Sequence, residues 1–317
     1  MSMKLNPFPF SLDNKRYHTL NYYNKNKFGI KVHKAVLECG FTCPNIDGSK
    51  GVGGCVFCDG GSGYFTVPNL TVTEQLKKEY ERLSGKFGND IKFIAYFQAN
   101  TNTYTSADRL EKLLNEAISF PNTIGISIGT RGDCLPDDII ELLKQVNKHT
   151  SLTVELGMQT MHDSTLSVIN RCCSHAEFLE GFYKLKNAGI RTCLHLINGL
   201  PNESTEMMLQ SANEVARMRP DAVKLQMLHI IKGTKLHEIY QNTDIKLLSR
   251  EEYIDIIVKQ LELLPAEIVI ERITGDGDKS KLIAPLWSSN KKAVINGIDK
   301  RLVELDTYQG RLYCSPN

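Results

Sequence analysis

Residues 31–58 read KVHKAVLECGFTCPNIDGSKGVGGCVFC, and this stretch decides the fold. Its first eight residues alternate as in a β-strand and run directly into a segment with four cysteines, Cys39, Cys43, Cys55 and Cys58. Two thiolates separated by two residues can bind one metal centre, because a short turn brings their sulfurs together. On spacing alone, a four-thiolate zinc site and an iron–sulfur cluster are equally good interpretations.

Short apolar or β-branched runs recur along the chain, with amphipathic segments between them. The further predicted strands are residues 91–98, 123–129, 152–157, 190–197 and 222–228. Six strands that alternate with helices predict a parallel α/β sheet with right-handed crossovers, either open and doubly wound or closed partway into a barrel. After about residue 235 the alternation fades, and a helix over 249–264 and a strand over 268–273 are expected in a segment packed on the sheet.

Composition narrows the class of protein. The chain has 317 residues with 23% charged and 41% hydrophobic residues, which excludes a disordered or fibrous protein. No run approaches the ~20 apolar residues of a membrane span, and the N-terminus lacks a signal-peptide core, so a cytoplasmic protein with no membrane partner is expected. Nine cysteines are therefore not expected to form a disulfide framework.

The net charge of the chain is only +2, but both of its ends are basic. Residues 1–34 hold seven Lys or Arg against one Asp, and residues 279–311 hold seven against three acids. Tyrosines and the tryptophan are interleaved with them, namely Tyr17, Tyr22, Tyr23, Trp287 and Tyr313. These ends suit phosphate contacts and base stacking, and they equally suit a solvated surface whose aromatic residues pack the termini down.

Polar residues or glycines follow each predicted strand, at the sheet edge where the cysteines lie. These residues are Gln98, Thr130, Arg131, Asp133, Glu155, Gln159, Gly199 and Pro201. Ligands of parallel α/β folds bind at the carboxyl ends of the strands. A zinc ion that only stiffened the fold would not need this ring of donors, whereas a cofactor bound against a metal cluster would.

The sequence resembles radical S-adenosylmethionine (SAM) enzymes, and more narrowly the YhcC/YtqA-type, MnmL-like family. The matching motifs are FGIKVHK (28–34), GFTCPNIDGSKGVGGCVFC (40–58), YFQANTNTY (96–104), GISIGTRGDCLPDD (125–138), ELGMQTMHDSTLSVINR (155–171), HLINGLP (195–201) and LHIIKGTKL (228–236). The resemblance covers about residues 16–290 and extends more distantly to the SAM domain of the Elongator catalytic subunit. It implies a partial (β/α)6 radical SAM barrel over 31–235, with its cluster loop at 39–58, a basic N-terminal extension over 1–30 and an α+β C-terminal extension over 236–317.

The resemblance also implies a role for each matching residue. Cys43, Cys55 and Cys58, separated by eleven and then two residues, would ligate three irons of a [4Fe–4S] cluster, and SAM would chelate the fourth. Cys39 is expected to bind no iron. Gln159 and Arg171 correspond to the SAM-contacting pair, with the guanidinium facing a carboxylate. The other expected SAM contacts are Gln98, Thr130, Arg131, Asp133, Glu155, Gly199 and Pro201. The family pattern predicts Gly-His after Arg171, where this chain has Cys172 and Cys173.

The implied activity is radical-based modification of the tRNA wobble uridine, from 5-carboxymethylaminomethyl to 5-aminomethyl uridine. The expected partners are a tRNA anticodon stem-loop and an electron donor such as flavodoxin or ferredoxin. Lys232, Lys235 and Arg272 are predicted near the substrate carboxylate. Two alternatives stay open: a radical SAM enzyme for a small metabolite or peptide, and a non-catalytic four-cysteine zinc module that binds nucleic acid.

Overall fold

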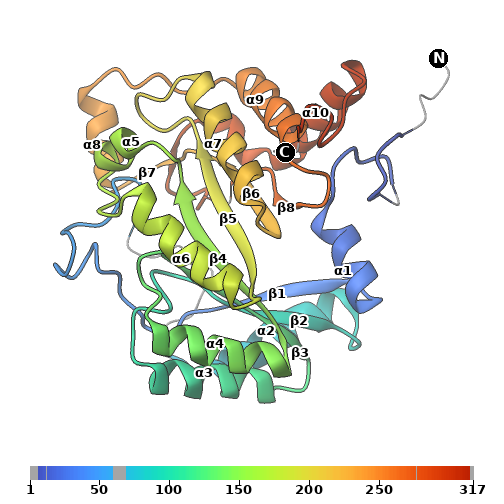
Figure 1. Cartoon of the computed structure of the whole chain (residues 1–317), viewed down its shortest axis with the longest axis vertical. Helices are drawn as coiled ribbons and strands as arrows, with labels where there is room; N and C mark the ends of the chain where they lie inside the picture. The colour runs from blue at the N-terminus through green and yellow to red at the C-terminus, as the bar shows by residue number, and fades with distance from the viewer. Residues whose placement is uncertain (1–5, 12, 60–68, 276, 315–317) are drawn as a thin grey trace.

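Seven parallel strands form the central sheet of the computed structural model, which describes residues 6–11, 13–59, 69–275 and 277–314. Their order in the sheet is the order in which they are written here: β1 (Val32–Leu37), β2 (Lys92–Phe97), β3 (Thr123–Thr130), β4 (Ser151–Gln159), β5 (Arg191–Asn198), β6 (Ala222–Met227) and β8 (Val269–Arg272). The sheet curls into a half-barrel (Figure 1). The predicted partial barrel and all six of its core strands are confirmed, and the strand expected over 268–273 joins the sheet beside β6.

Helices cover the outside of this sheet. Those that connect the core strands are α2 (Val72–Phe87), α3 (Ala107–Ser119), α4 (Asp137–His149), α5 (Asp163–Val168), α6 (His175–Asn187) and α7 (Thr205–Met218). Capping boxes at Thr71 and Ser174 start α2 and α6, as their spacing from Glu74 and Glu177 predicts. Pro136 is the N-cap of α4 and thus lies one residue before the first helical turn in which it was expected.

The hydrophobic core lies between the strands and the outer helices. Phe93 and Phe97 of β2 are fully buried, as are Leu110 and Leu114 of α3, which packs on the neighbouring strand β3. Successive strand residues point to opposite faces, so apolar residues face the helices and the intervening residues face the inside of the half-barrel. The inside is therefore free to carry polar groups.

The C-terminal part is built onto the half-barrel. Helix α9 (Arg250–Leu263) packs against both α7 and α10 (Lys291–Glu304). The remaining elements are α8 (Lys235–Asn242), the antiparallel pair β7 (Ile230–Ile231) and β9 (Leu282–Ala284), and a 3-10 helix (Leu286–Ser289). No helix among the described residues is long and apolar enough to cross a membrane.

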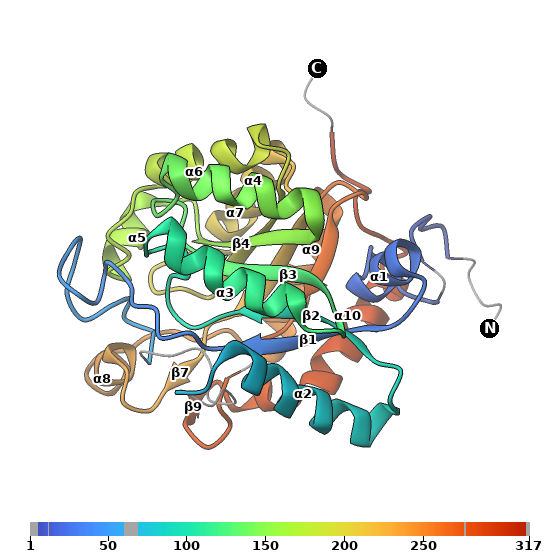
Figure 2. The same ribbon diagram turned by 90° about the horizontal axis from the view of Figure 1, so that it is seen from below.

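The N-terminal segment packs on the same side as the C-terminus. Helix α1 (Leu20–Phe28) lies next to β8, and Thr19 pairs with Ile270 through a single β-bridge. Tyr17 is 5% exposed, and Trp287 donates its indole N–H to the Leu248 carbonyl. For these two aromatic residues the packing interpretation is therefore the correct one. Figure 2 shows α1 at one end of the molecule, with the cysteine segment, α5 and α8 at the other.

Candidate active site

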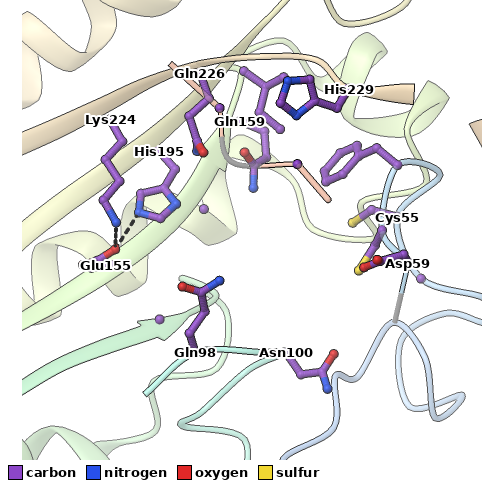
Figure 3. A pocket seen from close by; sticks show the side chains of 18 of the residues that line it. Cys55, Asp59, Gln98, Asn100, Glu155, Gln159, His195, Lys224, Gln226 and His229 are labelled. Atoms are coloured by element: carbon purple, nitrogen blue, oxygen red, sulfur yellow. Dashed lines mark hydrogen bonds and ion pairs between the residues drawn. The ribbon is translucent and has the colours of Figure 1, made fainter. Parts of the chain in front are cut away.

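The half-barrel encloses a cavity of about 500 Å³ whose deep wall comes from the strands. One set of inward-facing residues lies deep in it: Lys34, Tyr96, Glu155, His195 and Lys224. Two residues further along the same strands, a second set also lines the cavity: Val36, Gln98, Gly157, Ile197 and Gln226. This spacing follows from the two-residue period of a strand. Figure 3 shows five of these residues, Gln98, Glu155, His195, Lys224 and Gln226, around the cavity.

The cysteine loop lies at the mouth of this cavity. Cys43, Cys55 and Cys58 line it, whereas Cys39 does not. The Cys39 thiol packs against the hydrophobic core, and burial raises its pKa to about 12. The structure thus separates Cys39 from the other three thiols.

Backbone hydrogen bonds shape the loop. The Cys58 N–H donates to the Cys55 carbonyl over 2.9 Å, which closes the turn between these two cysteines. Val56, inside that turn, bonds through its N–H to the Ile169 carbonyl and through its carbonyl to the Leu236 N–H. Gly54 has φ +73°, a left-handed conformation that glycine adopts without strain. The loop is therefore fixed to segments more than a hundred residues away in the sequence.

The sulfur chemistry at the mouth fits an iron–sulfur cluster. The Cys55 sulfur accepts hydrogen bonds from Asn45 Nδ2 at 3.7 Å and from Arg171 Nη1 at 3.8 Å. Hydrogen bonds to the sulfurs are a common feature of iron–sulfur sites. Among the described residues no three His, Cys, Asp or Glu side chains converge on one metal ion.

Gln159 and Arg171 lie close together beside the thiols. Gln159, at the end of β4, has φ +69°, and its buried Oε1 has no hydrogen-bond partner among the described residues. Arg171 is 8% exposed and donates Nη2 to the Gly157 carbonyl at 2.8 Å. A Cβ on Gly157 would lie 2.6 Å from Gln159 Nε2 and 3.3 Å from Arg171 Nη2. A side chain at position 157 would thus displace the Gln159 amide from its present place.

Arg131 and Asp133 form a structural pair behind Arg171. The Arg131 guanidinium forks onto Asp133 with distances of 2.8 and 2.9 Å, and it also donates to the Arg171 and Cys172 carbonyls. Burial opposes ionisation of Asp133, but Arg131 and Lys50 outweigh it and lower the pKa of that carboxyl to about 2. Arg131 lines the cavity, as Thr130 does, whereas Asp133 does not. Asp133 is thus linked to the site through Arg131 and through Lys50 of the cysteine loop, 2.8 Å away.

Gly199 and Pro201 also lie outside the cavity lining. Gly199 has φ +84°, and its N–H contacts the sulfur of Met208. A Cβ at this position would lie 3.2 Å from Leu248. The structure thus gives this turn a packing role behind β5, while Ile197, two residues earlier, faces the cavity.

Glu155 is the centre of a buried polar cluster. Its carboxylate accepts hydrogen bonds from Lys34 (2.6 Å), Ser127 (2.7 Å), Tyr96 (2.8 Å) and His195 (2.9 Å), and also from Lys224. Burial alone would raise the pKa of Glu155, but the two lysines outweigh it and hold the pKa well below its ordinary value. Both carboxylate oxygens are already engaged, so Glu155 organises the side chains around it.

Several cavity residues were not identified from the sequence. Lys34, Tyr96, Lys224, Gln226 and His229 line the cavity. Lys224 and Gln226 interrupt the apolar run of β6 at alternate positions, and this pattern was the available signal. Of the cations expected near a substrate carboxylate, Arg272 lines the cavity, whereas Lys232 does not and Lys235 pairs with Glu238 on the surface.

A parallel half-barrel with three thiols beside a cavity at the carboxyl ends of its strands is typical of cofactor-dependent α/β enzymes. The family model described as the Radical SAM superfamily matches residues 48–215, and the Radical_SAM C-terminal domain matches residues 220–304. The chain belongs to the radical SAM superfamily and is a radical SAM enzyme. This family implies a [4Fe–4S] cluster and SAM.

The relatives extend over nearly the whole chain. It is 42% identical over 315 residues to the uncharacterized protein YtqA of Bacillus subtilis, a match that covers 98% of this chain and 97% of that protein. It is 33% identical to YhcC of Escherichia coli K12 over 89% of this chain and 88% of that protein. A shorter match, 28% identical over 192 residues, joins it to the tRNA uridine(34) acetyltransferase of Methanocaldococcus infernus, covering 58% of this chain and 35% of that protein.

Among solved structures, the archaeal Elp3 of Methanocaldococcus infernus without residues 1–46 has the same fold. It superposes with a TM-score of 0.67 at 18% identity, over 88% of this chain and 64% of that chain. The half-barrel and the elements packed on it are thus a shared architecture.

Proposed function

We propose that Cys43, Cys55 and Cys58 hold a [4Fe–4S] cluster and that SAM binds between it and the Gln159–Arg171 pair. The observation that carries this proposal is that all five side chains line one cavity. Gln98 and Thr130 line the same cavity and complete the SAM site. Arg131 and Asp133 position the Arg171 backbone, and the Gly199–Pro201 turn supports β5. The barrel core is assigned to residues 31–235, between extensions over 1–30 and 236–317.

When bound, the cluster and SAM together supply a 5′-deoxyadenosyl radical and accept the second electron of an oxidation. The chain's own residues bind and orient the cluster, SAM and the substrate. Arg171 provides a cation for the SAM carboxylate, and the orphaned Gln159 oxygen provides an acceptor for a donor on SAM. The strand residues exclude bulk water from the space beneath, which protects a reactive carbon.

The proposed substrate is a tRNA wobble uridine that carries a 5-carboxymethylaminomethyl group, converted to 5-aminomethyl uridine. The support is the resemblance to the YhcC/YtqA-type family together with the match to a protein named tRNA uridine(34) acetyltransferase. The proposed partners are the anticodon stem-loop and a one-electron donor such as flavodoxin or ferredoxin.

The reaction balances as an oxidation followed by a hydrolysis. The carboxymethyl CH₂ gives up one hydrogen atom, and the resulting carbon radical loses one electron while its neighbouring nitrogen loses a proton, which forms an imine. Water then adds to the imine carbon and breaks the carbon–nitrogen bond. The products are the 5-aminomethyl group and glyoxylate.

Deuterium at the carboxymethyl CH₂ tests this proposal. The anaerobically reconstituted protein, dithionite, SAM and an anticodon stem-loop RNA with the labelled group should yield 5-aminomethyl uridine and singly deuterated 5′-deoxyadenosine. Unlabelled 5′-deoxyadenosine with unchanged RNA would refute the tRNA reaction and favour a small metabolite or peptide as substrate. Cleavage of SAM that depends on Cys58 would still identify the radical chemistry.

A further inference from the structure

The deep end of the cavity is lined by charged residues that the SAM site does not use. We call Lys34, Tyr96, Glu155, His195 and Lys224 the cavity floor; they come from five different strands. His195 and Lys224 are paired in register on β5 and β6, so their side chains lie next to each other. Figure 3 shows both pointing to Glu155.

The cavity floor carries one more positive charge than negative. Glu271 accepts from both Lys34 and Arg191, and the Glu271–Arg191 pair is neutral by itself. The one negative charge of Glu155 then faces the two positive charges of Lys34 and Lys224.

The other two floor residues do not change this count. Burial and the nearby Lys224 charge lower the pKa of His195 to about 4, so its ring is neutral. Burial raises the pKa of Tyr96 well above its ordinary value, so it stays a phenol. Arg272 lines the same cavity but is not one of the floor residues.

A buried excess cation is costly unless an anion compensates it. The Lys224 side chain is 4% exposed, and Glu155 cannot serve as the second anion because its oxygens already accept from five side chains. No second carboxylate is among the five floor residues, and the two other carboxylates that line the cavity, Asp59 and Asp278, lie outside the floor. An anionic group of a ligand bound at the floor would compensate the excess charge.

We propose that the cavity floor is a binding subsite for a carboxylate of the substrate, with Lys224 as the residue that binds it. This inference rests on the proposed function, in which the ligand is the carboxymethyl group of the modified uridine. Glu155 is then a positioning residue, because it holds Lys224 and His195 in place. The subsite lies on the strands, and not on the segment of Lys232 and Lys235.

The floor is separate from the site proposed for the SAM carboxylate. Arg171 lies at the mouth beside Cys55, whereas Lys224 lies two residues before Gln226 on β6, deeper in the cavity. Gly157, the inward residue next after Glu155 on β4, carries no side chain of its own, and the Gln159 amide and the Arg171 guanidinium lie over it. The floor is therefore two strand residues below the level of the Gln159–Arg171 pair.

The test compares two anticodon stem-loop RNAs, one with 5-carboxymethylaminomethyl uridine and one with its neutral primary amide. Both keep the same CH₂ and the same scissile bond, so only the negative charge differs. For the wild type we expect kcat/KM to favour the carboxylate by about a hundredfold, mainly through KM. In Lys224→Gln this preference should fall to about twofold. Lys232→Gln, an exposed lysine outside the cavity, is the matched control and should behave as the wild type.

Each outcome has a distinct meaning. Equal turnover of both RNAs by the wild type, or an undiminished preference in Lys224→Gln, would overturn the subsite. Loss of SAM binding in Lys224→Gln would also overturn it, because the floor would then hold the cofactor.

Turnover of neither RNA by the wild type would refute the proposed function alone. The subsite is then decided by a binding measurement with N-methylglycine, whose carboxylate should raise the melting temperature of the wild type but not of Lys224→Gln. N-methylglycine amide should raise neither, and equal effects of the acid on both proteins would refute the subsite.

Discussion

The Arg171 guanidinium donates a hydrogen bond to the Cys55 sulfur, with Nη1 and Sγ 3.8 Å apart. These residues are separated by 116 positions in the sequence, and they belong to the two halves of the proposed site, the SAM contacts and the cluster ligands. The contact joins the two halves directly. Changes that move either residue should therefore affect both cluster retention and SAM binding.

Removal of a cavity thiol should abolish the cluster, while removal of Cys39 should not. Cys55→Ala is expected to purify with almost no iron or sulfide, because one of three ligands and the acceptor of the Arg171 hydrogen bond are lost. Cys39→Ala is the matched control and should retain the iron content of the wild type. Anaerobic iron and sulfide analysis measures both, and equal losses in the two variants would contradict the three-cysteine assignment.

Gly157→Ala should weaken SAM binding without loss of the cluster. The new Cβ would lie 2.6 Å from Gln159 Nε2, which forces that side chain to move. We expect the Kd for SAM to rise about tenfold, equal to about 1.4 kcal/mol, with unchanged iron content. Gly85→Ala is the control, since its Cβ meets nothing within 4 Å. An unaltered Kd for Gly157→Ala would show that Gln159 does not contact SAM.

Gly51 and Cys172 should be energetically coupled. Cys172 has φ +49°, and a Cβ on Gly51 would lie 2.6 Å from its sulfur and 2.3 Å from Asn45 Oδ1. Gly51→Ala should lower the free energy of unfolding by about 1–3 kcal/mol. The loss should be smaller by about 1 kcal/mol in a Cys172→Gly background, because one of the two clashes is gone. Urea unfolding of the four proteins measures the cycle, and strict additivity would contradict the contact.

Stability should fall as the pH drops from about 6.5 to about 4. Burial lowers the pKa values of both His195 and His229 to about 4 in the folded protein, while in the unfolded chain they titrate near 6.5. The unfolded state thus binds more protons in this window, so acid favours unfolding, and the stabilisation is complete above it. Urea unfolding at a series of pH values should show a shallower pH slope for His195→Gln than for the wild type. Parallel slopes would contradict a neutral, buried His195.

The sequence predicted most of the framework because its signals are local. Strand alternation located β1 to β6 within about two residues, and the capping boxes at Thr71 and Ser174 located two helix starts. The cysteine spacing and the family motifs singled out the residues that the structure gathers at the cavity mouth. Each of these features is determined by a few residues that are close together in the sequence.

The cavity floor could not be predicted because it depends on long-range geometry. Lys34 and Lys224 are 190 positions apart, and only the curl of the sheet brings both onto Glu155. Asp133 was assigned to the cofactor for its place in a motif, yet Arg131, two residues before it, engages its carboxylate. The sequence does not show whether a charged side chain such as Asp133 pairs with a neighbouring residue or with a cofactor.

Gly157 has one further consequence, for substrate length. It occupies the inward position next after Glu155 on β4, and two residues of strand advance by about 6.6 Å. The distance between the mouth and the floor is thus set by the backbone of the sheet. Movement of the loops does not change this distance. A substrate carboxylate bound to Lys224, as proposed, would lie at a fixed distance from the proposed SAM site. The number of bonds between that carboxylate and each carbon would then decide which hydrogen is removed.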